Sequence, residues 1–130
     1  KTEGEMMKVA DLIGAELDYW VARAEGVPHD ALSFVGGNRP TNWEACSIDG
    51  AGMYRPSIKW EIGGPIIERE RIAIDPITRN RSHTAEWQAQ VWVPFAVQTG
   101  ATPLIAAMRA FVAGKFSDEV SEEIGDENNP

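Results

Sequence analysis

Apolar residues recur at helical spacing near the start of the chain. Between residues 9 and 25 they stand three and four positions apart, which is typical of a helix with one buried face. Gly14 lies inside this stretch and divides a short first turn from a main helix over 15–25. Gly26, followed by valine and proline, predicts the end of that helix.

A second long helix is predicted near the C-terminus. Thr102 is a good N-cap and Pro103 suits the first helical position, and the apolar residues that follow keep helical spacing through residue 116. The predicted helix therefore covers 103–116. A shorter helix is predicted over 65–70, because a glycine–proline step opens it and Glu68 lies in its first turn.

Alternation of side-chain type marks the strands. Residues 87–93 place Trp87, Ala89, Val91 and Val93 on one face and glutamines with Trp92 on the other. The short apolar run 72–74 stops at an aspartate–proline step, and we expect it to pair with 87–93 through a hairpin connection over 75–85. The run 31–35 is a third, weaker strand, and the glycine-rich residues 36–53 read as a long connection.

These elements predict an α+β fold, in which a small antiparallel sheet of about three strands packs with two main amphipathic helices and one short helix. We place a single domain over residues 9–116, which suits a chain of 130 residues. Residues 1–8 are expected to be an N-terminal extension or an expression remnant. Residues 117–130 carry six acids and no base, so we expect a disordered acidic tail.

Charge and composition narrow the function classes. The net charge is −8, but the tail carries six of the 20 acids, so the remainder holds 14 acids against 12 bases. A near-neutral body disfavours binding to duplex nucleic acid, which needs a basic face. No apolar run is long enough for a membrane helix, and we expect a cytoplasmic protein.

Recognised chemical motifs are few. The lone Cys46 stands far in sequence from His29 and His83, so neither a metal site nor a cofactor is predicted, and no catalytic residue is assigned. The Gly63-Gly64-Pro65 step would leave free backbone N–H groups that can hold an anion, with Lys59 and Arg69 nearby. A purely structural start of a helix explains the same glycines.

Five tryptophans are many for this length. Trp20, Trp87 and Trp92 lie in patterned elements, where we expect core packing. Trp43 and Trp60 lie among glycine, proline and serine, where an exposed ring that contacts a ligand is the alternative to packing.

Three stretches resemble the phage NinX-type proteins in pattern and order. This is a small family of tailed phages and prophages with no assigned biochemical role. The layout is also similar to that of small phage alpha-beta-alpha sandwich domains. The resemblance implies a phage-encoded accessory protein of the bacterial cytoplasm and supplies no catalytic residues. It rests on DLIGAELDYWVARAEG at 11–26, YRPSIKWEIGGPIIERERI at 54–72 and GATPLIAAMRAFVAGKF at 100–116.

The leading hypothesis is a non-enzymatic module that binds a host or phage protein through the surface around residues 54–69. The alternative is sequestration of a small anionic ligand, such as a nucleotide signal used in host defence, and an enzyme is a third hypothesis. A homo-oligomer is compatible with all three. The predicted binding residues are Tyr54, Ser57, Lys59, Trp60, Gly63, Gly64, Glu68 and Arg69.

Overall fold

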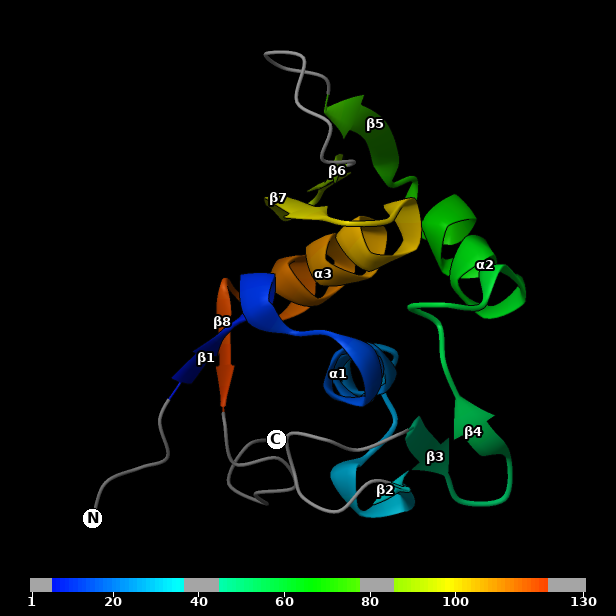
Figure 1. The fold of residues 1–130 in the computed structure, drawn as a ribbon. Coiled ribbons are helices and arrows are strands. Elements are labelled where there is room, and N and C mark those ends of the chain that lie inside the picture. Colours follow the sequence, from blue (N-terminus) through cyan, green and yellow to red (C-terminus); the bar gives the residue numbers. More distant parts are fainter. Residues whose placement is uncertain (1–5, 37–44, 78–85, 122–130) are drawn as a thin grey trace.

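A computed structural model of the chain describes residues 6–36, 45–77 and 86–121. These residues form three α-helices, two single-turn 3-10 helices and eight strands (Figure 1). The helices are η1 (Val9–Asp11), α1 (Gly14–Ala24), η2 (His29–Ala31), α2 (Trp60–Glu70) and α3 (Pro103–Lys115). The strands are β1 (Met6–Lys8), β2 (Leu32–Val35), β3 (Ala45–Ile48), β4 (Gly52–Tyr54), β5 (Ala73–Ile77), β6 (Glu86–Trp92), β7 (Phe95–Gly100) and β8 (Glu119–Ser121).

The strands form three small sheets, all antiparallel: β1–β8, β2–β3–β4 and β5–β6–β7. The α+β class is thus confirmed, but the single sheet of about three strands is only part of the architecture. Predicted strands 31–35 and 72–74 appear as β2 and β5, and β5 pairs with β6 as predicted, with Ile74 opposite Ala89.

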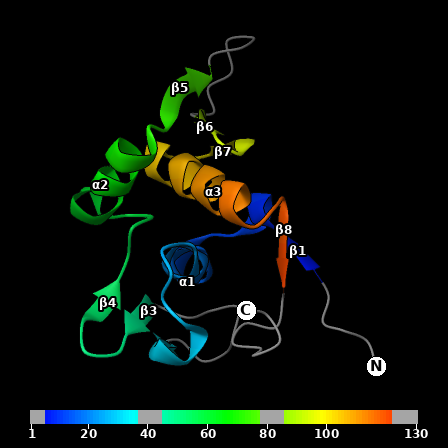
Figure 2. The same cartoon turned by 180° about the vertical axis from the view of Figure 1, so that it is seen from behind.

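The helices lie between the two three-stranded sheets. Helix α3 packs on β5–β6–β7, α1 packs on α3, and β3 packs on the far side of α1. Both views show this order, with α2 beside the N-terminal half of α3 (Figures 1 and 2). The layers therefore differ from those of an alpha-beta-alpha sandwich, in which helices cover both faces of one central sheet.

The strands that were not predicted are short or weakly patterned. Strand β3 lies inside the predicted connection 36–53, and β4 overlaps its end. The two are joined by a turn at which Gly50 and Gly52, the first residue of β4, have φ of +82° and +90°. Strand β7 buries only small residues, Ala96 and Gly100, so it lacks an apolar signature. Within the predicted connection 75–85, residues 75–77 belong to β5, and 78–85 lie outside the described residues.

The two long helices are where their capping residues place them. Gly14, with φ of +62°, separates the single turn η1 from α1, and Gly26 follows α1 with φ of +100°. The hydroxyl of Thr102 accepts a hydrogen bond from the backbone N–H of Ile105 at 3.1 Å, which satisfies one free donor at the start of α3. Both predicted helices are thereby confirmed to within two residues of their observed ends.

Residues assigned to the extension and to the tail form a strand pair. Met7 in β1 lies opposite Val120 in β8, and Val120 is only 3% exposed. The backbone N–H of Val9 also donates to the carbonyl of Asp118 at 2.8 Å. One buried apolar side chain and a ladder of backbone hydrogen bonds thus order residues 119–121, contrary to the expectation of disorder there. Residues 1–5 and 122–130 lie outside the described part.

The core lies between α1, α3 and the sheets that face them. Trp20 is 1% exposed and Trp87 is partly buried against the core, as predicted. Trp92 is 55% exposed, so its assignment to the core is wrong: it ends β6 on the face that α3 does not cover. Trp43 lies outside the described residues.

Within the part of the chain that the structure describes, no helix has the length and apolar character needed to span a membrane.

Candidate functional site

The predicted binding surface lies where β4 leads into α2. Between them, residues 55–59 form a tight turn, which we call the 55–59 turn. The backbone N–H groups of Ile58 and Lys59 both donate to the carbonyl of Arg55, at 3.1 and 2.9 Å. The turn therefore continues directly into α2, whose first residue is Trp60.

A buried carboxylate anchors this turn to α1. The backbone N–H of Ser57 donates to Oδ1 of Asp18 at 2.8 Å, and each residue is 2% exposed. Burial raises the pKa of Asp18 to about 6, and the Ser57 hydrogen bond and the charge of Arg55 offset part of that rise. Asp18 is enclosed among core residues, so its position is that of a structural anchor.

The groups around Asp18 are held in their protonated forms. Burial, with the nearby charge of Asp18, raises the pKa of the Cys46 thiol to about 12. Burial also raises the pKa of Tyr54, and the charge of Glu25 adds to the effect. A thiol with so high a pKa is a poor nucleophile at neutral pH, because the thiolate is the reactive form. Near Asp18, the hydroxyl of Ser57 and Nε of Arg55 are buried without a hydrogen-bond partner, as is Nε1 of Trp20 elsewhere in the described core.

Next to this buried anchor, large apolar side chains point outward. Ile58 is 58% exposed and Trp60 is 54% exposed, although Pro56 and Ser57 in the same turn are fully buried. Met53, on β4, is 56% exposed. We call Met53, Ile58 and Trp60 the α2-start surface. Of the two interpretations for Trp60, the structure favours exposure over packing.

The predicted helix start at Gly63-Gly64-Pro65 is wrong. Helix α2 begins five residues before Pro65, and the backbone N–H of Gly63 donates to the carbonyl of Lys59 at 2.9 Å. Gly63 therefore offers no free N–H group to an anion. Its role is close packing: a Cβ at this position would lie 2.6 Å from the carbonyl oxygen of Pro56 and 2.7 Å from Cδ2 of Leu104.

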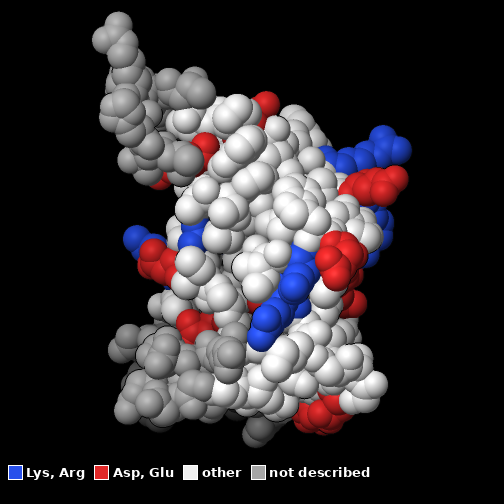
Figure 3. All heavy atoms as spheres, turned by 45° about the vertical axis from the view of Figure 1, so that its right-hand side comes forward, with Lys and Arg blue, Asp and Glu red and all other residues white. Residues whose placement is uncertain are grey.

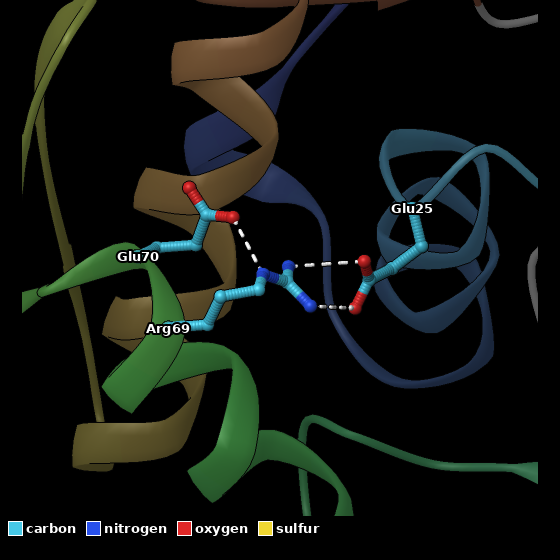
Figure 4. Close-up of polar contacts among 3 residues, drawn as sticks. All are labelled: Glu25, Arg69 and Glu70. Atoms are coloured by element: carbon cyan, nitrogen blue, oxygen red, sulfur yellow. Dashed lines mark hydrogen bonds and ion pairs between the residues drawn. The ribbon is translucent and has the colours of Figure 1, made fainter.

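Two further predicted residues, Glu68 and Arg69, lie in the last turns of α2. Glu68 is exposed. Arg69 joins α2 to the end of α1, because its guanidinium contacts both carboxylate oxygens of Glu25, at 3.0 and 3.3 Å (Figure 4). Its Nε also donates to Glu70 at 2.8 Å, and its guanidinium lies 5.8 Å from the ring centre of Phe111. All three nitrogens of the Arg69 guanidinium thus contact carboxylates of the protein, whereas Lys59, the other side-chain donor of the anion hypothesis, is exposed.

The structure thus divides the eight predicted residues. Lys59, Trp60, Glu68 and Arg69 are exposed, Ser57 and Gly63 are buried, and Tyr54 and Gly64 lie between these extremes. Asp18 was not among the predicted residues, and its only signal in the sequence is a carboxylate in the middle of an apolar helical run. On the side of the molecule that carries α2 and β4, basic and acidic side chains stand beside one another among larger uncharged areas (Figure 3).

Comparison with known proteins gives one family. Residues 8–115 match the family model described as Bacteriophage P22, NinX. No curated protein matches the chain. The matched range includes all three α-helices and the whole α2-start surface. Because it spans most of the 130 residues, the chain belongs to the NinX family of phage proteins, whose role is unknown.

Proposed function

We propose that the protein is a non-enzymatic phage accessory module of the bacterial cytoplasm, which binds a host or phage protein through the α2-start surface. One observation carries the proposal: Ile58, in a turn whose backbone is anchored in the core, and Trp60, at the start of the helix that continues it, are each more than half exposed. Large apolar side chains that are exposed and rigidly presented are characteristic of protein-binding sites.

The anchoring matters because it lowers the cost of binding. A partner that covers Trp60 does not have to order its backbone, since the 55–59 turn is already held by two hydrogen bonds to Arg55 and one to Asp18. Binding still costs translational and rotational freedom and the ordering of interface side chains, but it does not also cost the ordering of this backbone. Tryptophan is also among the residues most enriched at the energetic centres of interfaces.

The test compares partner binding by variants of the α2-start surface with partner binding by a variant of an equally exposed isoleucine elsewhere. Ile58→Ala and Trp60→Ala are expected to weaken partner binding at least about tenfold, while stability stays within about 0.5 kcal/mol, because both side chains are exposed. Ile13→Ala is the matched control, since Ile13 is also 58% exposed but lies before α1. The tagged full chain is purified from bacterial cells that express the phage genes, and co-purifying proteins are quantified by mass spectrometry.

A protein that is lost with Ile58→Ala and Trp60→Ala, but retained with Ile13→Ala, is then purified and its Kd measured with each variant. Retention of every co-purifying protein by both α2-start variants contradicts the proposal. Equal loss with Ile13→Ala also contradicts it, because the effect would then not belong to this surface.

The alternative, sequestration of a nucleotide signal, has no specific observation in its favour. The amide of Gly63 and the guanidinium of Arg69 are engaged within the protein, and Tyr54 is partly buried. We therefore expect a panel of mono-, di- and cyclic nucleotides to leave the Tm unchanged. A concentration-dependent rise in Tm, together with a nucleotide adduct in native mass spectrometry, would restore this alternative.

A further inference from the structure

The sheet β5–β6–β7 has one face that no described element covers. Helix α3 packs on the other face, where Ala89 and Val91 of β6 and Ala96 of β7 are buried. Because side chains alternate along a strand, the intervening residues share the opposite face. This outer face consists of Ala73, Asp75 and Ile77 from β5, Glu86, Gln88, Gln90 and Trp92 from β6, and Phe95, Val97 and Thr99 from β7.

One end of the outer face is apolar and exposed. Trp92 and Phe95 lie opposite each other across the β6–β7 turn, with ring centres 6.3 Å apart at an angle of 61°. They are 55% and 65% exposed, and Val97 beside them is 37% exposed. Val93 in the turn is 93% exposed. So much accessible apolar area on one hairpin is typical of a contact surface. None of these residues belongs to the α2-start surface.

The other end of the outer face is acidic. Asp75 lies opposite Gln88, and Glu86 lies opposite Ile77, so the two acids are diagonal neighbours on adjacent strands. Both acids are exposed. Across the described residues of this face there is no lysine or arginine. Gln88 and Trp92 are four residues apart along β6, which places the acidic and apolar ends about 13 Å apart.

We propose that the outer face of β5–β6–β7 binds a basic amphipathic segment of a partner protein. The apolar side chains of this segment would cover Trp92, Phe95 and Val97, and its lysines or arginines would lie against Asp75 and Glu86. Charge complementarity selects this occupant. A second copy of the chain would bring another face whose described residues include no base, and a nucleic acid or an anionic membrane would be repelled by the acids. The site is separate from the α2-start surface and does not depend on it.

The experiment uses two designed peptides as probes. Each is an amphipathic helix of about four turns with leucines along one face. One carries two lysines at one end of that face, and the other carries glutamates at the same positions. The full chain, labelled with 15N, is titrated with each peptide, and backbone amide shifts locate the binding.

The lysine peptide is expected to bind saturably and to shift the amides of β5, β6 and β7. Trp92→Ala and Phe95→Ala should each weaken it at least about tenfold, and Asp75→Asn with Glu86→Gln about three- to tenfold. Trp60→Ala is the matched control, because Trp60 and Trp92 are almost equally exposed, at 54% and 55%. It should leave the affinity unchanged, and unfolding curves confirm that each variant is folded.

Three results overturn the proposal. In the first, the glutamate peptide binds as tightly as the lysine peptide, which removes the charge argument. In the second, no saturable binding occurs. In the third, the amide shifts lie on residues 53–60 and disappear with Trp60→Ala. A fourth result would also overturn it: a concentration-dependent dimer that Trp92→Ala abolishes would assign the face to a second copy. Shifts on residues 53–60 would place peptide binding at the α2-start surface and so favour the proposed function. The other results leave the proposed function untouched, because its test rests on Ile58 and Trp60.

Discussion

Replacing Gly63 with alanine is expected to destabilise the protein by about 1–3 kcal/mol. The new methyl group would lie within 2.7 Å of two atoms, the carbonyl oxygen of Pro56 and Cδ2 of Leu104. The leucine side chain can move, but the Pro56 carbonyl belongs to the turn that is anchored to Asp18. Helix α2 must therefore shift away from the turn, although alanine itself favours the helix by about 0.5–1 kcal/mol.

The neighbouring glycine provides the control. At Gly64 a Cβ would meet only Cε3 of Trp60, at 3.9 Å, which is ordinary contact. Gly64→Ala should therefore leave stability unchanged or raise it by about 0.5–1 kcal/mol. Urea unfolding of the two variants and of the unaltered protein makes the comparison. Equal effects at the two positions would show that helix propensity, and not the close approach to Pro56, governs this part of α2.

The stability of the protein relative to its Asp18→Asn variant is expected to fall by about 2–3 kcal/mol between pH 4 and pH 7. The pKa of Asp18 rises from an ordinary 3.8 to about 6 on folding, because the carboxylate loses its hydration. Between these two pH values the unfolded chain releases the proton and the folded chain keeps it. Rising pH thus favours unfolding there, and the loss is complete above about pH 6. Asparagine has no such proton.

The measurement is the free energy of unfolding from denaturant titrations at several pH values for both proteins. Only the difference between them is interpreted, since all other acids contribute equally. Asp49→Asn, in an exposed turn, controls for the change in formal charge. A difference that stays constant from pH 4 to pH 7 would contradict the placement of Asp18 in the interior. A difference that grows with pH in favour of the aspartate would reverse the sign and show that the charge of Arg55 and the Ser57 hydrogen bond outweigh the loss of hydration.

Both predictions concern the 55–59 turn, which contacts α1 through Asp18 and α2 at Gly63. Asp18 holds the 55–59 turn from α1, and Gly63 lets α2 approach the same turn closely. Both features are costly, since a buried carboxylate loses hydration and a glycine weakens a helix. Together they determine where Ile58 and Trp60 project, which is why we regard the turn as the support of the binding surface.

Much of the helical framework could be predicted because its signals are local. Thr102 caps α3 with a hydroxyl three residues from its donor, and Gly14 and Gly26 bound α1 through conformations that other residues rarely adopt. The start of α2 could not be predicted in this way. No side chain caps it, and the proline that indicated a first turn lies inside the helix.

The sheets were less predictable because short strands carry little pattern. Four residues in β3 and three in β4 are too few for alternation to be recognised, and their pairing depends on a glycine turn. Trp92 shows that even a clear alternation does not tell which face of a strand is buried. Its alternation in β6 is clear, but only the position of α3 determines which face of the sheet is buried.

By itself, the sequence determined the family, the α+β class, the two long helices and the pairing of β5 with β6, since these depend on residues close together in the chain or on a matched pattern. Only the tertiary structure decided what the exposed and buried groups do. The contact of Asp18 with Ser57 joins residues 39 apart, and that of Arg69 with Glu25 joins residues 44 apart. Such contacts arise from the packing of whole elements, so no local sequence pattern predicts them. They determine which side chains remain exposed and able to bind a partner.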